Sequence, residues 1–518
     1  MPGYIFDFNF DNLSFIFLLT GLIITLLLMM ITKNYIKVKR REYYIINILF
    51  MISFSILLFT DSWLAFIVAW ELVTVATSLI LLWENRGIAS QYFILQFTGT
   101  VFLFLAFLLA INNDYTSIMS ISELWLQNLF ILGVAMKSAI IGFHFWMAPI
   151  YSKGLSHFNA ISSGWVVKLG FILLLRLIPE GNSLLLVLGI LMVFYGGVKA
   201  LRESDLNVIL AFSSLSQLGF IAIGIGSGTV YGYLGSILHI IAHAFAKSGL
   251  FIISGQMFKE YASSCIYDFR QTWKRHPLSS LTMIIAFASL MGIPFLAGFN
   301  SKYLIKYGFE NQIFFSILMY AAALLTTLYS IRVLYWSIFR ELILAKAMPA
   351  GKKNNVLGNN KEESINRSNS NIQYTEKETI KDREGNLDYK KEEKTLQLRW
   401  LEYLVLILIM TLLLFVGLQA ELLIDIIMEI DFTYNILTGF IEIAIIFLLA
   451  LLILYKCDYI EIKRSKAPSL DYVFQIVYKY VYNTGRNLYN WIYQDFQYQL
   501  LWIPVFLIVL FLWGLIFV

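Results

Sequence analysis

The sequence predicts an all-α protein that crosses a membrane many times. Its 518 residues are 59% hydrophobic and only 14% charged, with a mean hydropathy of +0.71. A soluble domain is about 45–50% apolar and about 25% charged. Apolar runs of roughly 20 residues, the length that crosses a bilayer as a helix, follow one another almost without gaps. Runs of this length exclude the short strands of a membrane barrel, so we expect helices.

The apolar runs predict about fourteen transmembrane helices, at 12–32, 43–61, 63–83, 90–111, 124–147, 158–178, 184–201, 205–226, 232–257, 278–298, 310–340, 399–420, 435–456 and 499–518. The first run has no small-residue cleavage site after it, so we expect a membrane helix and no cleavable signal peptide. Cys265 and Cys457 lie far apart without CxxC or histidine spacing, which argues against a metal site, a haem site or a disulfide framework.

The charge of the loops supports this assignment. Basic residues lie in every second loop, in the stretches 33–42, 86, 153, 199–202, 259–275, 341–398 and 456–466. The intervening loops are poor in them, and the N-terminus, 112–123 and 421–434 carry acidic residues without Lys or Arg. By the positive-inside rule, both termini are expected to face outward. Lys302 and Lys306 are the exception, because they fall on the wrong side of the alternation.

Two segments are not expected to span the membrane. Residues 341–398 are polar with both charge signs mixed, which predicts a flexible cytoplasmic loop, with a binding role as the alternative. Residues 469–498 keep apolar side chains at helical spacing after Pro468. They predict an amphipathic helix that lies on the membrane surface or along neighbouring helices, ahead of the last span.

Ionisable side chains lie inside several predicted helices. A Lys at the centre of a membrane helix costs roughly 2.5–3.5 kcal/mol, so such residues are usually functional. The stretch LHIIAHAFAKSGLF (238–251) holds three of them at a spacing of four residues, which places all three near one helix face. The candidate residues are Glu71, Lys137, Lys168, His239, His243, Lys247 and Lys302.

Each candidate also has a structural interpretation. Lys168 could extend its ammonium to the membrane surface, and Glu71 and Lys137 could form a buried ion pair without a transport role. The two histidines could be packed core residues or a metal pair. We discount a metal because the sequence offers no third ligand of the usual kind.

Taken together, these residues predict a proton path. Burial favours the neutral form of an amine, and histidine titrates near neutral pH, so both can exchange protons. Pro294 and Gly298 in GIPFLAGFNSK predict a broken helix before Lys302. Supporting polar groups are expected from neighbouring helices, although isolated serines are also ordinary packing contacts. They are His144, Ser163, Ser213 and Gln217.

Four motifs, in order, resemble those of a known family. They are FHFWMAP…SSGWVVKLGFILLLR (143–176), ALRESDLNVILAFSSLSQLGF (200–220), HIIAHAFAKSGLFIISG (239–255) and MGIPFLAGFNSK (291–302). The family comprises the antiporter-like membrane subunits of respiratory complex I, of energy-converting membrane-bound hydrogenases and of multisubunit cation/proton antiporters. The resemblance covers roughly residues 45–340 and rests on the four motifs together.

The resemblance implies two inverted repeats of five helices, at 43–178 and 184–340, each a half-channel with one broken helix. It implies that Glu71 modulates the proton affinity of Lys137, that Lys168 is the central lysine, and that Lys302 lies at the outlet. His239, His243 and Lys247 would lie on the helix that links the half-channels. The remaining segments would be an N-terminal helix with its basic loop (1–42), the polar loop (341–398), C-terminal helices (399–456), and a short lateral helix with a final span (457–518).

The sequence departs from the family pattern at several positions. The prolines usual after the first lysine are absent, with Gly142 in that stretch, and the usual Ala-His pair is replaced by Tyr151-Ser152. Asn207 stands where a basic residue is usual, and fewer helices precede Glu71 than in most members.

We therefore expect an ion-translocating subunit in an energy-conserving membrane, such as the cytoplasmic membrane of a prokaryote. Its partners would be other membrane subunits, including small ones and further antiporter-like subunits, with the lipid bilayer and H⁺ or Na⁺. We find no nucleotide, flavin, haem or iron–sulfur motif, so we expect no cofactor, no nucleic acid, and any redox chemistry in another subunit. The alternatives are a stand-alone Na⁺/H⁺ antiporter and a scaffold subunit that has lost transport.

Overall fold

The computed structural model describes residues 8–35, 40–82, 86–118, 120–340, 388–428 and 436–456. These residues are helical apart from connecting turns and two isolated backbone bridges, which confirms the all-α prediction for this part of the chain. Ten of the described helical segments are long and apolar enough to cross a membrane. The predicted amphipathic helix at 469–498 and the last predicted span at 499–518 lie outside the described residues.

The first part of the bundle contains five consecutive helical segments behind an N-terminal helix, α1 (Asn12–Tyr35). The fourth and fifth segments are each divided. The elements are α2 (Arg40–Phe59), α3 (Trp63–Leu82), α4 (Arg86–Asn112), α5 (Leu124–Ala135) with η1 (His144–Trp146) and α6 (Met147–Lys153), and α7 (Ser156–Gly164) with η2 (Val166–Lys168) and α8 (Leu169–Leu177).

The second part repeats this plan, because its fourth segment is again divided into two helices. The elements are α9 (Ser183–Arg202), α10 (Leu206–Gly226), α11 (Val230–Tyr261), the short α12 (Thr272–Arg275), α13 (Pro277–Met291) with α14 (Ala297–Tyr307), and α15 (Ile313–Leu334) with the π-turn η3 (Tyr335–Phe339). Three further helices follow, α18 (Asp388–Leu418), α19 (Ala420–Met428) and α20 (Ile436–Lys456).

Both predicted helix breaks are present. After α5 the chain turns at Ala139 and Gly142, whose φ angles of 51° and 93° no α-helix can contain. After α13 it turns at Gly292 and Phe295, with φ angles of 87° and 68°. The first break therefore forms without the family's prolines, because two left-handed residues interrupt the helix instead.

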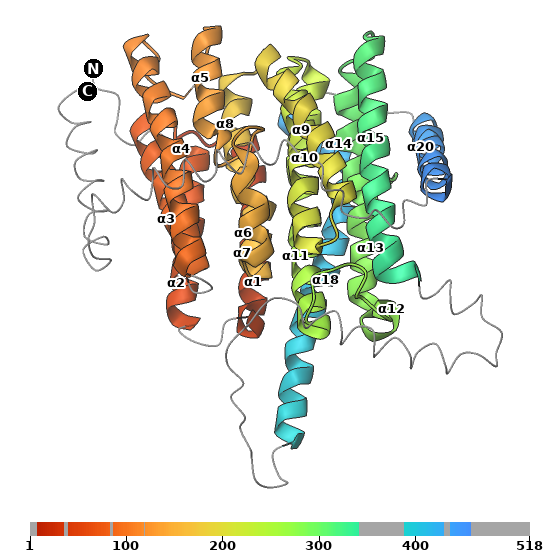
Figure 1. The fold of residues 1–518 in the computed structure, drawn as a ribbon. Helices are drawn as coiled ribbons and strands as arrows, with labels where there is room; N and C mark the ends of the chain where they lie inside the picture. Colours follow the sequence, from red (N-terminus) through yellow and green to blue (C-terminus); the bar gives the residue numbers. More distant parts are fainter. Residues whose placement is uncertain are drawn as a thin grey trace.

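The two parts are joined by α11, which packs against α7 of the first part and against α10, α13 and α14 of the second. Figure 1 shows α11 in the middle of the bundle. The α4–α5 connection and the start of α15 lie at one end, and α12 and the start of α18 lie at the other. α12 carries Lys274 and Arg275, two of the basic residues in the stretch 259–275.

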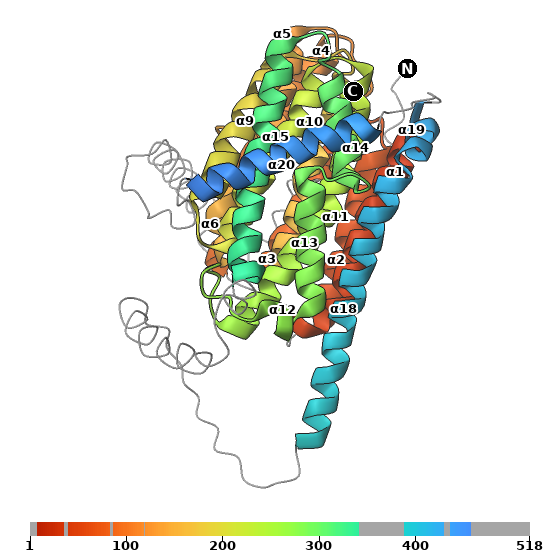
Figure 2. The same ribbon diagram turned by 90° about the vertical axis from the view of Figure 1, so that its right-hand side faces the viewer.

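Two C-terminal elements differ from the sequence-based expectation. α18 begins at Asp388, so residues 388–398 continue a helix rather than a flexible loop, as their Lys-, Glu- and Leu-rich sequence permits. α20 occupies the predicted span at 435–456 but lies across α15, rather than parallel to the other helices (Figure 2). An ion pair from Glu442 in its second turn to Lys306 of α14 joins it to the bundle.

The interface between α9 and α10 leaves no room for a side chain at Gly196. A Cβ atom there would lie 2.6 Å from the backbone nitrogen of Ser216 and 2.7 Å from the carbonyl oxygen of Phe212. We expect Gly196→Ala to separate these helices and to lower the unfolding free energy by about 1–3 kcal/mol, the usual cost of overpacking. Thermal unfolding of the detergent-solubilised protein measures this change.

Gly249→Ala is the matched control, because its Cβ would meet side-chain atoms and no backbone, Ile409 at 3.1 Å and Thr282 at 3.8 Å. Equal melting temperatures for the two variants would contradict the close helix contact.

Candidate functional site

Lys137 lies in the first helix break and is buried against α3. Its ammonium donates to the carbonyl oxygen of Trp70 at 2.9 Å and to the hydroxyl of Thr74 at 2.8 Å. The same nitrogen lies 4.1 Å from the centre of the Trp70 ring, a cation–π contact. Lys137 lies in the last helical turn before the chain leaves the helix at Ala139, since the backbone nitrogen of Ser138 still donates to the carbonyl oxygen of Val134.

Glu71 follows Trp70 on α3 and is also buried. Its carboxylate interacts electrostatically with Lys137 and with the hydroxyl of Thr100. One carboxylate oxygen, Oε1, has no hydrogen-bond partner among the described residues. The pairing of Glu71 with Lys137 stays a prediction.

Lys168 and Lys247 lie on either side of a pair of serines. Lys168 ends η2 and donates to the carbonyl oxygen of Ser163 at 2.5 Å. The hydroxyls of Ser163 and Ser214 share a hydrogen bond of 2.8 Å, which joins α7 to α10.

Lys247 completes this cluster from α11. It donates to the hydroxyl of Ser213 at 2.5 Å and to the carbonyl oxygen of Leu210 at 3.1 Å. The hydroxyl of Ser214 donates to the same carbonyl. Ser163 and Ser213, expected to support the path, thus contact its lysines directly.

The two histidines of α11 continue from this cluster toward α14. Their rings stack with centroids 6.2 Å apart, as the four-residue spacing predicts. Nδ1 of His239 lies 2.9 Å from the hydroxyl of Ser301. Both ring nitrogens of His243, and Nε2 of His239, are buried without a hydrogen-bond partner among the described residues. Buried polar atoms of this kind are usually served by water, so a hydrated path fits here.

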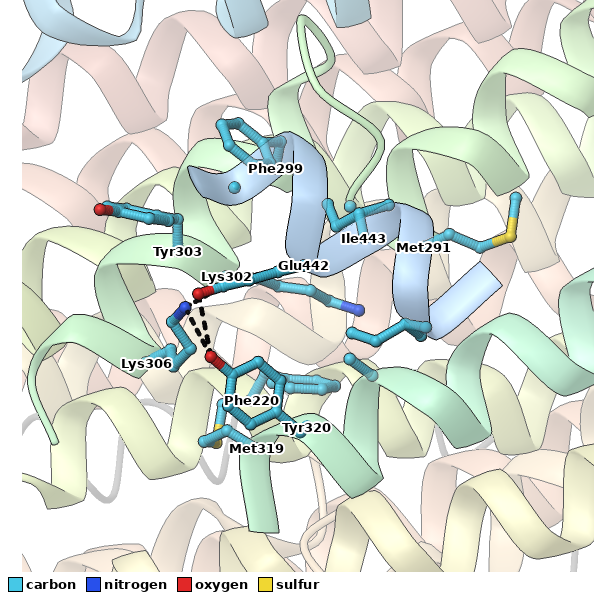
Figure 3. Close-up of a pocket in the computed structure, with 14 residues that line it drawn as sticks. Phe220, Met291, Phe299, Lys302, Tyr303, Lys306, Met319, Tyr320, Glu442 and Ile443 are labelled. Atoms are coloured by element: carbon cyan, nitrogen blue, oxygen red, sulfur yellow. Dashed lines mark hydrogen bonds and ion pairs between the residues drawn. The ribbon is translucent and has the colours of Figure 1, made fainter. Parts of the chain in front are cut away.

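Lys302 lies one turn into α14, just after the second break. It donates to the carbonyl oxygen of Leu290 at 2.6 Å, and its ammonium lies 4.3 Å from the centre of the Phe220 ring. A pocket between α14, α15 and α20 has Lys302 on its wall (Figure 3). Lys306, Tyr320 and Glu442 line the same pocket.

Lys302 and Lys306 broke the alternation of loop charges, and their positions explain why. Both belong to α14 and not to a loop. Lys306 forms an ion pair with Glu442.

The two other supporting residues are buried and contact neighbouring helices. The ring of His144 packs edge-on against Tyr195 of α9, with centroids 5.1 Å apart. The side chain of Gln217 donates to the hydroxyls of Tyr329 and Thr326 on α15, at 2.9 and 3.3 Å.

A set of buried hydroxyls between Lys137 and Lys168 was not predicted from the sequence. Thr77, one turn from Thr74 on α3, donates to the hydroxyl of Tyr92 at 3.4 Å. Tyr92 also interacts with the hydroxyl of Ser162, which shares a 3.0 Å hydrogen bond with Tyr151. The replacement of the family's Ala-His pair by Tyr151-Ser152 was the available signal, because a Tyr in an apolar core needs a polar partner.

His157 was also missed. It is buried at the junction of α1, α2 and α7, where its Nδ1 and the hydroxyl of Tyr43 form a short hydrogen bond. Its Nε2 lies 3.0 Å from the carbonyl oxygen of Leu28. No sequence spacing links these residues, so only the fold could bring them together.

No group of three or more His, Cys, Asp or Glu side chains that could hold a metal ion occurs in the described part of the chain. Among the described residues, the polar atoms that contact the four buried lysines are hydroxyls and main-chain carbonyls, and the carboxylate of Glu71 interacts with Lys137.

Comparisons with known proteins show which family the chain resembles. The family described as NADH:quinone oxidoreductase/Mrp antiporter, TM, matches residues 60–327. NADH-ubiquinone oxidoreductase chain 5 of Cryphonectria parasitica is 30% identical over 364 residues, which cover 64% of this chain and 55% of that protein. The antiporter subunit mnhA2 of Staphylococcus aureus is 30% identical over 337 residues, which cover 57% and 42%. The chain thus spans about half the length of the curated relatives it matches.

Two solved structures share the fold. The Mrp complex of Dietzia sp. DQ12-45-1b matches with a TM-score of 0.69 at 20% identity, over 98% of this chain and 56% of that chain. Respiratory complex I of Thermus thermophilus matches with a TM-score of 0.62 at 19% identity, over 85% and 86%.

The contact between Lys137 and Thr74 can be tested without a transport assay. Thr74→Val removes one acceptor from a buried ammonium, so we expect a loss of about 1–3 kcal/mol in unfolding free energy. In a Lys137→Met background the same change should cost little, because no ammonium needs the hydroxyl. Thermal unfolding of the four proteins of this double-mutant cycle measures the coupling.

Thr20→Val is the control, since Thr20 bonds only to the carbonyl oxygen of Ile16 within its own helix. Additive effects of Thr74→Val and Lys137→Met would rule out the contact.

Proposed function

We propose a function for this chain, which belongs to the NADH:quinone oxidoreductase/Mrp antiporter transmembrane family. The proposed function is that of an antiporter-like membrane subunit that moves protons across an energy-conserving membrane. The observation that carries the proposal is the row of four buried lysines, each in contact with a backbone carbonyl. The lysines are Lys137, Lys168, Lys247 and Lys302.

Protons would pass along this row in both parts of the bundle. Glu71 would bias the protonation of Lys137, because a carboxylate stabilises a neighbouring ammonium. Between Lys137 and Lys168 the buried hydroxyls of Thr77, Tyr92 and Tyr151 would carry the proton, since a hydroxyl both donates and accepts. Ser163 and Ser214 would extend this chain to Lys247, and His243 and His239 would extend it to Lys302.

The partners would be other membrane subunits of a multisubunit complex. The solved structures with this fold come from an Mrp complex and from respiratory complex I, both assemblies of many subunits. Either a redox reaction or a cation gradient would then drive the protons, with the redox centres in other chains. The membrane would be an energy-conserving one, such as the cytoplasmic membrane of a prokaryote, and the loop charges favour an orientation with both termini outside.

Removal of Lys137 tests the function directly. In inverted vesicles that contain the assembled complex, we expect Lys137→Met and Glu71→Ala to lower the rate of proton uptake. For Lys137→Met the fall should be on the order of 10²-fold or more, as is typical when a proton-transfer group is lost. Quenching of a pH-sensitive dye, driven in turn by NADH and by a Na⁺ gradient, measures the rate and separates the two drives.

Unchanged proton uptake in Lys137→Met vesicles with normal subunit content would favour the scaffold alternative. Transport by the purified chain alone, in liposomes, would favour a stand-alone antiporter.

The hydroxyl route makes a separate prediction. Tyr151→Phe keeps the ring against Phe251 and removes only the hydroxyl bonded to Ser162. We expect proton uptake to fall by roughly tenfold, because water can replace one hydroxyl only in part. Tyr44→Phe is the control, since that hydroxyl bonds to the carbonyl oxygen of Met29, away from the lysines. Equal rates for both variants would exclude Tyr151 from the route.

A further inference from the structure

The two lysines at the helix breaks have different surroundings. Lys137 has a carboxylate beside it from α3, the second helix of the first five. The second helix of the second five is α10, and its sequence from Leu206 to Gly226 contains no acidic residue. Lys302 therefore lacks the partner that the corresponding helix would supply.

A carboxylate reaches the same pocket from α20. Glu442 pairs with Lys306, and its Oε1 accepts a hydrogen bond from the hydroxyl of Tyr320 at 2.9 Å. Lys306 donates to Tyr320 at 3.3 Å, which closes a triangle of polar groups from three helices. In Figure 3 the ammonium of Lys302 points away from this triangle. It donates to the carbonyl oxygen of Leu290 instead.

We propose that Glu442 is the acidic partner of Lys302 and accepts the proton that Lys302 releases toward the outside. This rests on the proposed function. Lys302 turns within the pocket from the carbonyl of Leu290 to the carboxylate of Glu442. The N–H bond breaks and an O–H bond forms, which leaves a neutral amine and a neutral carboxylic acid. The acid then gives the proton to water, and the carboxylate returns to Lys306.

The exposure of the three side chains fits this order. Lys302 is 8% exposed, and the side chains of Lys306 and Glu442 are 18% and 31% exposed. A proton that moves from Lys302 to Glu442 thus moves from a buried side chain to a more exposed one. Lys306 and Tyr320 hold the carboxylate in place between transfers.

A purely structural role for Glu442 makes different predictions. Glu442 would then only neutralise the charge of Lys306. If the role is structural, proton uptake that is lost when the charge of Glu442 is removed should recover when the charge of Lys306 is removed as well.

The experiment measures proton uptake by inverted vesicles that contain the complex. Glu442→Gln keeps the shape of the side chain and an oxygen for Tyr320 but cannot accept the proton. We expect uptake to fall by roughly tenfold or more, and to stay low in the double variant Lys306→Met/Glu442→Gln. Glu402→Gln is the matched control, since Glu402 accepts from Gln256 at 2.9 Å and pairs with Lys259, outside the pocket.

Recovery of uptake in the double variant would overturn the proposal in favour of the structural role. Normal uptake in Glu442→Gln, with uptake lost in Lys137→Met, would overturn it and leave the proposed function intact. Normal uptake in Lys137→Met would remove the proposed function itself.

Discussion

The structure depends on how it accommodates ammonium groups in an apolar bundle. Each of the four buried lysines donates to a main-chain carbonyl, of Trp70, Ser163, Leu210 or Leu290. A carbonyl cannot take a proton at ordinary pH and carries only a partial charge. It therefore solvates the ammonium without holding the proton as firmly as a buried carboxylate would. The helix break at 292–296 matters because it lets Lys302 of α14 reach the carbonyl oxygen of Leu290 near the end of α13.

Much of this arrangement could be predicted from the sequence. The four-residue spacing of His239, His243 and Lys247 fixed their common face, because helix geometry depends only on the number of residues. The second break followed from Pro294 and Gly298. The first break was less evident, since it depends on Ala139 and Gly142 in left-handed conformations that the residue types alone do not require.

The remaining contacts could not be predicted because they join distant segments. Tyr151, Tyr92 and Ser162 come from three helices and meet only in the folded bundle. Glu442 lies more than a hundred residues from Lys306, on a helix whose apolar sequence predicted an ordinary span. The apolar sequence of α20 does not indicate the angle at which the helix packs against its neighbours. Its contacts with α14 and α15 show that it crosses them.

The continuity of α11 has a consequence for how this protein can change over evolution. Its 32 residues run without interruption past both parts of the bundle. Because each residue advances a helix by about 1.5 Å and turns it by about 100°, one inserted residue between His243 and Lys247 would swing the lysine off its serines and carbonyl. Point substitutions leave this spacing intact. We therefore expect an insertion within α11 to disrupt the protein more than most point substitutions in it, and insertions to be tolerated better in the loops beyond its ends.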